Sequence, residues 1–339
     1  MTAPAAPAPE RASWRRLALG LAAFLIAPLV PAMRAMMPVE QTPMLVVVVV
    51  AACAVVAWKN GGRLFLALLW VAIAAVTLMS PAGPPDSPYS WLARGWALLL
   101  AASFGLVSII AATEAFFPRA LSALAVATSL SFALVLVSPG GPTRISNAMT
   151  AEFNRRNDQS ISSLRQVSNA PGWKEVVNGS PTLQRLTEES EAQLTSIPKW
   201  STVVVPALLA LESLAALALG WALFHRMSKV AIGPRLGKLR DFRFNDQLVW
   251  GVAVGASIFL LPAFSEGKNA GLNLLVFFGV LYTLRGFGIL AWASRTRALA
   301  FFIIALAVIA WPFVTALAFG LGLGDTWLDL RTRAQAKPL

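Results

Sequence analysis

The feature that most constrains this chain is a series of apolar blocks, each about 15 to 27 residues long. A helix needs roughly 20 apolar residues to cross the hydrocarbon core of a bilayer, so blocks of this length predict membrane spans. With 57 % hydrophobic and 13 % charged residues, the chain also has too little polar surface to cover a soluble core of its size. We therefore predict an all-α fold, a polytopic transmembrane helix bundle.

Nine apolar segments can be marked, and prolines and glycines occupy most of the breaks between them. The segments are Leu17–Met33, Met44–Trp58, Arg63–Met79, Trp91–Phe117, Ala120–Val137, Ser201–Phe224, Gln247–Ala263, Gly271–Ala293 and Ala298–Leu323. The last is long enough for either one helix kinked at Pro312 or two segments that turn there. The second segment, Met44–Trp58, is short for a span, so the sequence predicts eight or nine spans. The two arrangements at Pro312 leave the side of the C-terminus open.

The basic residues predict an orientation, because Lys and Arg in short loops stay on the cytoplasmic side. With the N-terminus inside, fourteen basic residues fall in cytoplasmic segments, and the short outer segments hold only Arg34, Arg94 and Lys268. The fourteen are Arg11, Arg15, Arg16, Lys59, Arg63, Arg119, Arg226, Lys229, Arg235, Lys238, Arg240, Arg243, Arg295 and Arg297. This distribution indicates a cytoplasmic N-terminus. The basic residues lie in short segments between apolar runs, so the net charge of +12 does not imply a nucleic-acid partner.

We expect five parts along the chain. Residues 1–16 are a disordered Ala/Pro-rich tail, 17–138 an N-terminal membrane half of about five spans, and 139–200 a polar helical insert. Residues 201–324 are a C-terminal membrane half of three to four spans, and 325–339 a charged tail. By the orientation above, the insert is extracytoplasmic.

The insert has the periodicity of helices. Apolar residues recur at helical spacing from Ile145 to Leu164 and predict an amphipathic helix over Thr143–Val167. A second helix is expected over Pro181–Ser196, before Pro198 and Trp200 mark re-entry into the membrane. The insert has too few apolar side chains for a core of its own, so it either packs on the membrane domain, on lipid headgroups or on a partner, or stands as a solvated hairpin.

Two charged residues lie deep in predicted spans, where each costs at least about 2.5 kcal/mol and calls for a partner or a water-filled cavity. Counted from the outer face, Glu212 is roughly 16 Å deep and Arg285 roughly 21 Å deep. The reach of an arginine covers this difference. We therefore hypothesise a buried Glu212–Arg285 pair, with Tyr282 one turn before Arg285 on the same face. The pair is either purely structural or part of a ligand cavity.

The loop His225–Phe244 carries six basic residues and forms a candidate cytoplasmic basic patch. Such a patch either fixes topology by attraction to anionic lipid headgroups or docks a cytoplasmic partner. Its members are Arg226, Lys229, Arg235, Lys238, Arg240 and Arg243.

The residue types argue against catalysis and cofactors. One cysteine, Cys53, and one histidine, His225, cannot supply a zinc, haem or iron–sulfur ligand set. Asp325 and Asp329 are spaced like acids that hold magnesium-bound diphosphate, but this pair stands alone and Arg331 is close enough to neutralise it. We therefore expect no catalytic, cofactor-binding or metal-binding residues.

Three features resemble a known family. They are the polar insert that ends at Pro198 and Trp200, the stretch Tyr282 to Gly286 around Arg285, and the closing Gly, Asp, Trp, Asp and Arg of residues 322–331. In these the chain resembles the YybS-like family of uncharacterised bacterial multispan membrane proteins (DUF2232). The resemblance implies a bacterial inner-membrane location. The family has no established activity, so it implies no site residue.

Members of that family look distantly similar in fold to the substrate-binding S-components of energy-coupling-factor importers, which implies a link to transport. The leading function hypothesis is a non-catalytic, transport-related subunit that binds a small solute or lipid between helices. The sequence has no P-loop, so active transport would need a partner ATPase in addition to membrane lipids. The competing hypothesis is a membrane scaffold or regulator that docks envelope or cytoplasmic proteins, and the third is an intramembrane lipid-processing enzyme.

Overall fold

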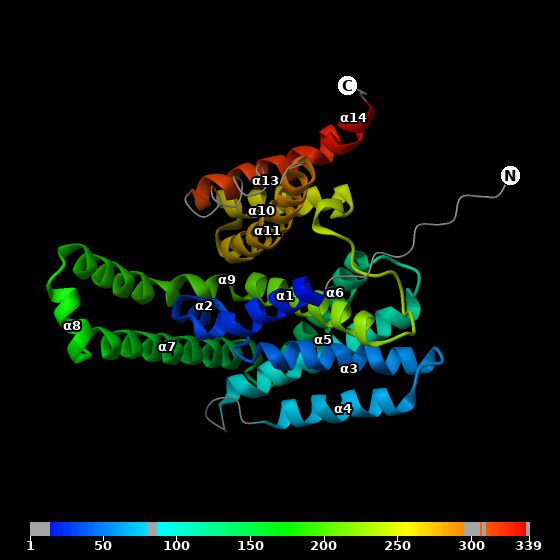
Figure 1. Ribbon diagram of the computed structural model, residues 1–339, viewed down its shortest axis with the longest axis horizontal. Helices are drawn as coiled ribbons and strands as arrows, with labels where there is room; N and C mark the ends of the chain where they lie inside the picture. Colours follow the sequence, from blue (N-terminus) through cyan, green and yellow to red (C-terminus); the bar gives the residue numbers. More distant parts are fainter. Residues whose placement is uncertain (1–13, 81–86, 295–305, 307–309, 337–339) are drawn as a thin grey trace. The chain divides into compact units, whose positions relative to one another are not determined.

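The computed structural model describes residues 14–80, 87–294, 306 and 310–336 (Figure 1). These residues form α-helices joined by turns and short 3-10 helices, and no strand occurs among them. The predicted all-α class is therefore confirmed. Two compact units can be separated: unit 1 comprises Met1–Val30, Gln41–Ala127 and Ala215–Arg235, and unit 2 comprises Pro31–Glu40, Thr128–Leu214 and Leu236–Leu339.

Unit 1 is built from helices of the first half of the chain and the end of one long helix. Its elements are α1 (Trp14–Ile26), η1 (Ala27–Leu29), α3 (Thr42–Lys59), α4 (Leu64–Met79), α5 (Pro88–Ile110), the start of α6 (Phe116–Val137) and the end of α9 (Pro181–Met227). α4 and α5 both pack against α3.

Helix α3 forms the core of unit 1 because it is apolar on every side. Its Leu45, Val49 and Val50 side chains are fully buried. At Gly220, α9 approaches α3 so closely that a Cβ would overlap the Val49 side chain. A helix that is hydrophobic all round is suited to this central position.

Unit 2 holds the rest of the helices. Its elements are α2 (Pro31–Met36), the end of α6, α7 (Gly141–Ser168), α8 (Pro171–Asn178), the start of α9, η2 (Leu239–Asp241), η3 (Asp246–Leu248), α10 (Val249–Leu260), η4 (Pro262–Gly267), α11 (Lys268–Ala293), α13 (Trp311–Leu328) and α14 (Leu330–Ala336). α11 packs against both α10 and α13.

Glycines permit this packing in unit 2. A Cβ at Gly286 of α11 would overlap the backbone of Ala318 on α13, and one at Gly322 would overlap the backbone of Tyr282. Small residues at helix contacts let two backbones approach, which is how membrane helices gain van der Waals contact. The α11–α13 contact therefore depends on residues without side chains.

The helix predicted over Thr143–Val167 is confirmed, since α7 includes this range. Arg156 on α7 is buried and donates from Nε to Glu152 Oε1 at 2.8 Å and from Nη1 to the Met37 carbonyl at 2.8 Å, which ties α7 to the residues after α2. Burial alone would raise the pKa of Glu152, but hydrogen bonds from Arg155 and Arg156 outweigh it and lower that pKa.

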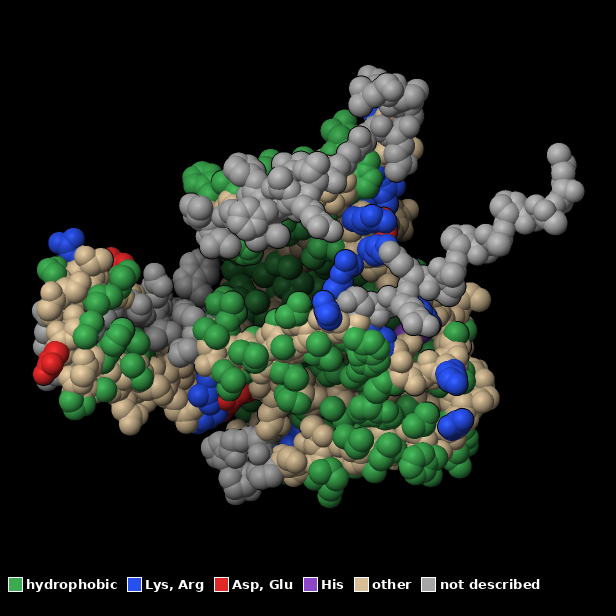
Figure 2. Space-filling view, in the orientation of Figure 1, with side chains coloured by type: hydrophobic (Ala, Val, Ile, Leu, Met, Phe, Trp, Pro, Cys, Tyr) green, Lys and Arg blue, Asp and Glu red, His purple; other side chains and the backbone are tan. Residues whose placement is uncertain are grey.

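Among the described residues, five helical segments are long and apolar enough to cross a membrane: Thr42–Lys59, Pro88–Ile110, Phe116–Val137, Thr202–Met227 and Pro262–Ala293. Leu64–Met79 and Asp246–Leu260 are shorter apolar helices. In Figure 2 the visible face over α3 and α4 is largely hydrophobic, as expected of helices solvated by lipid.

Three expected boundaries differ in the structure, and each difference lies at a proline. Leu17–Met33 is not one helix, because α1 ends at Ile26 and is followed by a 3-10 turn and α2. α9 continues through Pro198 instead of restarting there, since an internal proline can kink a helix without ending it. Pro312 lies in the first turn of α13, where its missing N–H is not needed, and most of residues 298–310 lie outside the described residues.

Candidate functional site

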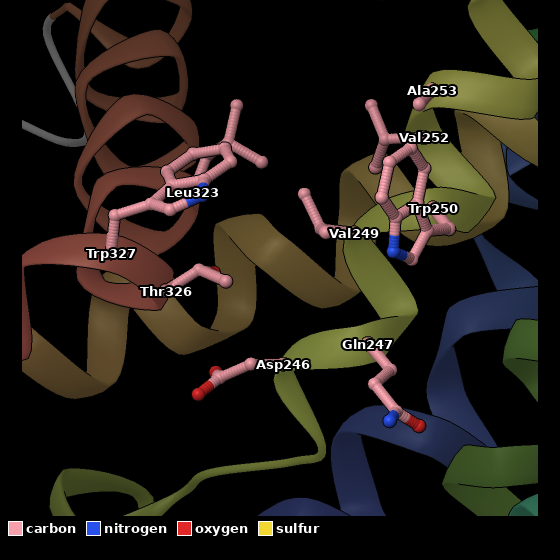
Figure 3. A pocket seen from close by; sticks show the side chains of 9 residues that line it. All are labelled: Asp246, Gln247, Val249, Trp250, Val252, Ala253, Leu323, Thr326 and Trp327. Carbon is pink, nitrogen blue, oxygen red and sulfur yellow. The ribbon is translucent and has the colours of Figure 1, made fainter.

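The candidate site is a groove in unit 2 between α10 and α13, with a volume of about 590 Å³. Figure 3 shows Leu323 and Trp327 of α13 on one side and Val249, Trp250 and Val252 of α10 on the other. Nine described residues line it: Asp246, Gln247, Val249, Trp250, Val252, Ala253, Leu323, Thr326 and Trp327. The volume is in the range of about 300–1,000 Å³ that is usual for small-molecule sites.

The walls of this groove are apolar and accessible. Trp250 is 68 % exposed and Trp327 is 65 % exposed, so neither indole is covered by the described protein. Val249, Val252, Ala253 and Leu323 supply the rest of the apolar lining. An alkyl or aromatic group could be buried between the two helices.

One end of the groove is polar. Asp246 and Gln247 of η3 and Thr326 of α13 lie there (Figure 3). Asn245 caps η3, since its side chain accepts a hydrogen bond from the Gln247 backbone N–H at 3.0 Å. This cap fixes the turn that presents the Asp246 carboxylate, whose side chain is 59 % exposed.

Arg285 of α11 stands behind this polar end. It is 2 % exposed and donates from Nε to Asp325 Oδ2 at 3.0 Å and from Nη1 to Asp246 Oδ1 at 2.6 Å. Arg285 Nη2 also lies 2.9 Å from Asp325 Oδ2. A buried guanidinium between two carboxylates is a charge-assisted arrangement that fixes all three side chains.

The shell around Arg285 is aromatic and closely packed. The guanidinium carbon lies 5.4 Å from the centroid of the Phe244 ring. Phe244 in turn contacts Tyr282 edge to face with centroids 5.0 Å apart, and Tyr282 is fully buried. The predicted neighbourhood of Tyr282 and Arg285 therefore exists, although their partners differ from those expected.

Arg331 of α14 holds the segment that leads to the groove. Its guanidinium donates to the carbonyls of Arg240 at 2.9 Å and Phe242 at 3.2 Å. Asp325 Oδ1 accepts from the Leu330 N–H at 3.1 Å. These bonds join the end of α13, α14 and residues 240–242 to one another.

The predicted Glu212–Arg285 pair is not formed. Glu212 is 7 % exposed and its Oε2 accepts a hydrogen bond from the Val39 N–H at 2.9 Å. Arg285 is occupied by Asp325 and Asp246, two acids that begin or end apolar segments. The depth count considered only charges near span centres, so it omitted carboxylates that reach Arg285 from segment ends.

Arg331 does not form the expected ion pair with Asp325 or Asp329, although its charge interacts electrostatically with Asp325. Asp325 pairs with Arg285, and Asp329 pairs with Arg243. Asp329 adopts a left-handed backbone conformation with φ of 40° at the end of α13. The two acids therefore do not act as a joint ligand pair. In the described ranges no cluster of three His, Cys, Asp or Glu side chains could hold a metal ion.

The six residues of the predicted basic patch divide between the two units. Arg226, Lys229 and Arg235 belong to unit 1, and Lys238, Arg240 and Arg243 to unit 2. Arg226 donates to the Ala222 carbonyl, and Arg243 pairs with Asp329.

Unit 1 also holds a fully buried arginine, Arg119. Its Nη1 donates to the Ile232 carbonyl at 3.0 Å. Its Nη2 donates to the carbonyls of Ala111 at 2.9 Å, Ala112 at 3.0 Å and Glu114 at 2.9 Å. The guanidinium carbon lies 4.7 Å from the Trp221 ring centroid. Within the described part of unit 1 no carboxylate forms an ion pair with it, so Arg119 is a clamp on backbone carbonyls.

The site residues that the sequence did not predict are Asp246 and the groove walls. Asp246 could have been found from its position, because it is an acid at the start of an apolar segment and an arginine lies in a later span. No sequence signal marks the groove walls, because tryptophans such as Trp250 and Trp327 are also typical of headgroup anchors.

The long apolar helices and the buried ion pairs define the class: this is an integral α-helical membrane protein. The chain belongs to the family of predicted membrane proteins DUF2232, whose profile matches residues 95–326. The match covers Arg119, Glu212, Asp246, Arg285 and Asp325. No curated protein and no solved structure matches the chain, so the similarity to importer S-components stays a prediction.

Proposed function

We propose that this chain is a non-catalytic, transport-related subunit of the bacterial cytoplasmic membrane that binds a small solute or lipid in the α10–α13 groove. The observation that carries the proposal is the lining of the groove, which has tryptophans and aliphatic side chains on its walls and the Asp246 carboxylate at one end. Ligand sites combine a mostly apolar lining with a few polar groups that fix orientation. A lipid-facing surface without a binding role has no need for such a polar end.

The proposed orientation has the N-terminus and the loop His225–Phe244 in the cytoplasm. The orientation is supported by the fourteen basic residues that it places in cytoplasmic segments, against three in the short outer segments. It also gives the polar end of the groove a cytoplasmic opening, because Asp246 follows that loop directly. Reporter fusions within the loop test the assignment. A cytoplasmic reporter should be active there, and activity of an extracytoplasmic reporter would reverse the orientation.

Native mass spectrometry after gentle extraction tests binding. The wild-type chain should retain a small molecule, and Ala253→Trp should displace it because Ala253 lines the groove. Val254→Trp is the matched control, since the neighbouring Val254 is exposed on α10 but does not line the groove. Equal retention by both variants would contradict the proposal. Active transport would further require an ATPase that co-purifies with the chain.

A scaffold or regulator is the second candidate. It is favoured by Trp173 and Val176 of α8 and Leu186 of α9, which are exposed although they lie in the polar insert. Co-purification of envelope proteins that is lost on Trp173→Ala and Val176→Ala, with no small molecule retained, would support the scaffold over the ligand-binding subunit.

A further inference from the structure

We propose that the ligand of the α10–α13 groove is a cationic amphiphile, with an amine head at Asp246 and an alkyl chain between Trp250 and Trp327. This inference rests on the proposed function and specifies its ligand class. It follows from the charges at the polar end, the aromatic walls and the exposure of one carboxylate.

The exposed carboxylate at the end of the groove favours a cation. Arg285 donates to the carboxylates of both Asp325 and Asp246, and the buried Arg331 adds a second positive charge near Asp325. Asp325 is fully enclosed, whereas Asp246 is more than half exposed. Asp246 is also the charged member of the described groove lining. The charged group that a ligand head meets in the groove is therefore a carboxylate.

The nearby basic side chains are committed elsewhere. Arg331 donates to the carbonyls of Arg240 and Phe242. Arg243 forms an ion pair with Asp329, outside the groove lining. An anionic head placed beside Asp246 would face like charge without a guanidinium directed toward it, and like charges oppose binding.

The rest of the lining accommodates the other parts of the ligand. Trp250 and Trp327 present exposed indoles on opposite sides of the groove (Figure 3), where the alkyl chain is placed. Gln247 offers an amide oxygen acceptor at the polar end for another N–H group of an amine. The apolar wall residues accept the chain.

Three chain-matched photoreactive amphiphiles test the inference, one with a primary amine, one with a hydroxyl and one with a carboxylate. The full-length protein is labelled in lipid nanodiscs, and labelled α10 and α13 peptides are quantified by mass spectrometry. The amine probe should label these peptides about tenfold more than the carboxylate probe, which corresponds to about 1.4 kcal/mol of preference. Asp246→Asn should remove the preference, Asp246→Glu should keep it, and Asp329→Asn should leave it unchanged.

The outcomes separate the inference from the proposed function. If Ala253→Trp blocks labelling by all three probes and the wild-type chain takes them equally, the groove binds ligands but the cationic head is wrong. A carboxylate preference would overturn the inference in the same way. If Ala253→Trp blocks none of the labelling, both the inference and the proposed function fail. The wild-type comparison requires no variant, so it distinguishes the three head groups even if Asp246→Asn folds poorly.

Discussion

Arg119 in unit 1 and Arg285 in unit 2 are both buried in apolar helices, yet the chain satisfies them in different ways. Arg119 donates to the carbonyls of four residues that precede or follow helices. Arg285 donates to two carboxylates on separate elements. Each also lies over an aromatic ring, Trp221 for Arg119 and Phe244 for Arg285.

The difference separates a structural arginine from a candidate site. Backbone carbonyls are permanent partners, so the Arg119 clamp fixes chain geometry and offers nothing to a ligand. The carboxylate of Asp246 is exposed in a groove, so the Arg285 cluster can respond to what binds there. A buried charge in a membrane helix indicates a function only when one of its partners is accessible.

The largest effect is expected for Arg119→Met. This change removes the side-chain donor from four backbone carbonyls, and each group left unsatisfied costs about 1–3 kcal/mol. Monodisperse protein should be lost on size-exclusion chromatography. Arg119→Lys should fail as well, because one ammonium cannot reach all four carbonyls. Normal folding of Arg119→Met would show that the clamp is dispensable.

Arg285→Met should destabilise the protein by about 3–5 kcal/mol, because it leaves the buried Asp325 carboxylate uncompensated. Arg285→Met with Asp325→Asn should recover much of the melting temperature, since the buried Asp325 carboxylate that had lost its ion-pair partner is then neutral. Within the described part of unit 1, Arg119 forms no ion pair with an acid whose neutralisation could rescue it. If the double variant is no more stable than the single one, the two arginines do not differ as described.

Gly322→Ala should cost about 1–3 kcal/mol by forcing α13 away from the Tyr282 backbone. Gly320→Ala is the matched control, because a Cβ there meets nothing within 4 Å. The control should be neutral or stabilised by about 0.5–1 kcal/mol, as alanine favours helix. Thermal unfolding of both variants measures the difference, and equal melting temperatures would refute the close α11–α13 contact.

A smaller effect is expected when pH is lowered, because Arg156 pairs with the carboxylate of Glu152 and this pair stabilises the fold. The lowered pKa of Glu152 means that its contribution to stability is present above the ordinary value of 4.5 and is lost as pH falls through the folded value. The melting temperature should therefore fall on acidification below about pH 4.5, and Glu152→Gln should flatten that decrease. Glu189→Gln, at an exposed position of α9, is the control and should retain the wild-type acid response.

The fold class could be predicted because block length and hydropathy are local properties of the sequence. The helix over Thr143–Val167 could also be predicted, since its apolar stripe recurs at helical spacing. The division of Leu17–Met33 and the continuity of α9 through Pro198 could not, because a proline can begin, kink or end a helix and neighbouring packing decides which.

The candidate site was predicted only in part. Arg285 could be identified from its depth in an apolar segment, and Tyr282 from its spacing of one turn. Their partners could not, because Asp246 and Asp325 approach Arg285 from the start of η3 and the last turn of α13, and only tertiary packing brings these ends together. Glu212 was correctly expected to be buried, but its backbone partner Val39 leaves no trace in a sequence pattern.

The most direct test of the central claim is a cryo-electron microscopy map of the full chain in lipid nanodiscs, with the region between α10 and α13 resolved. We predict elongated non-protein density between Trp250 and Trp327 that ends at Asp246 and disappears in Ala253→Trp. A groove closed by direct packing of α10 on α13, or density that stays unchanged in Ala253→Trp, would contradict the claim.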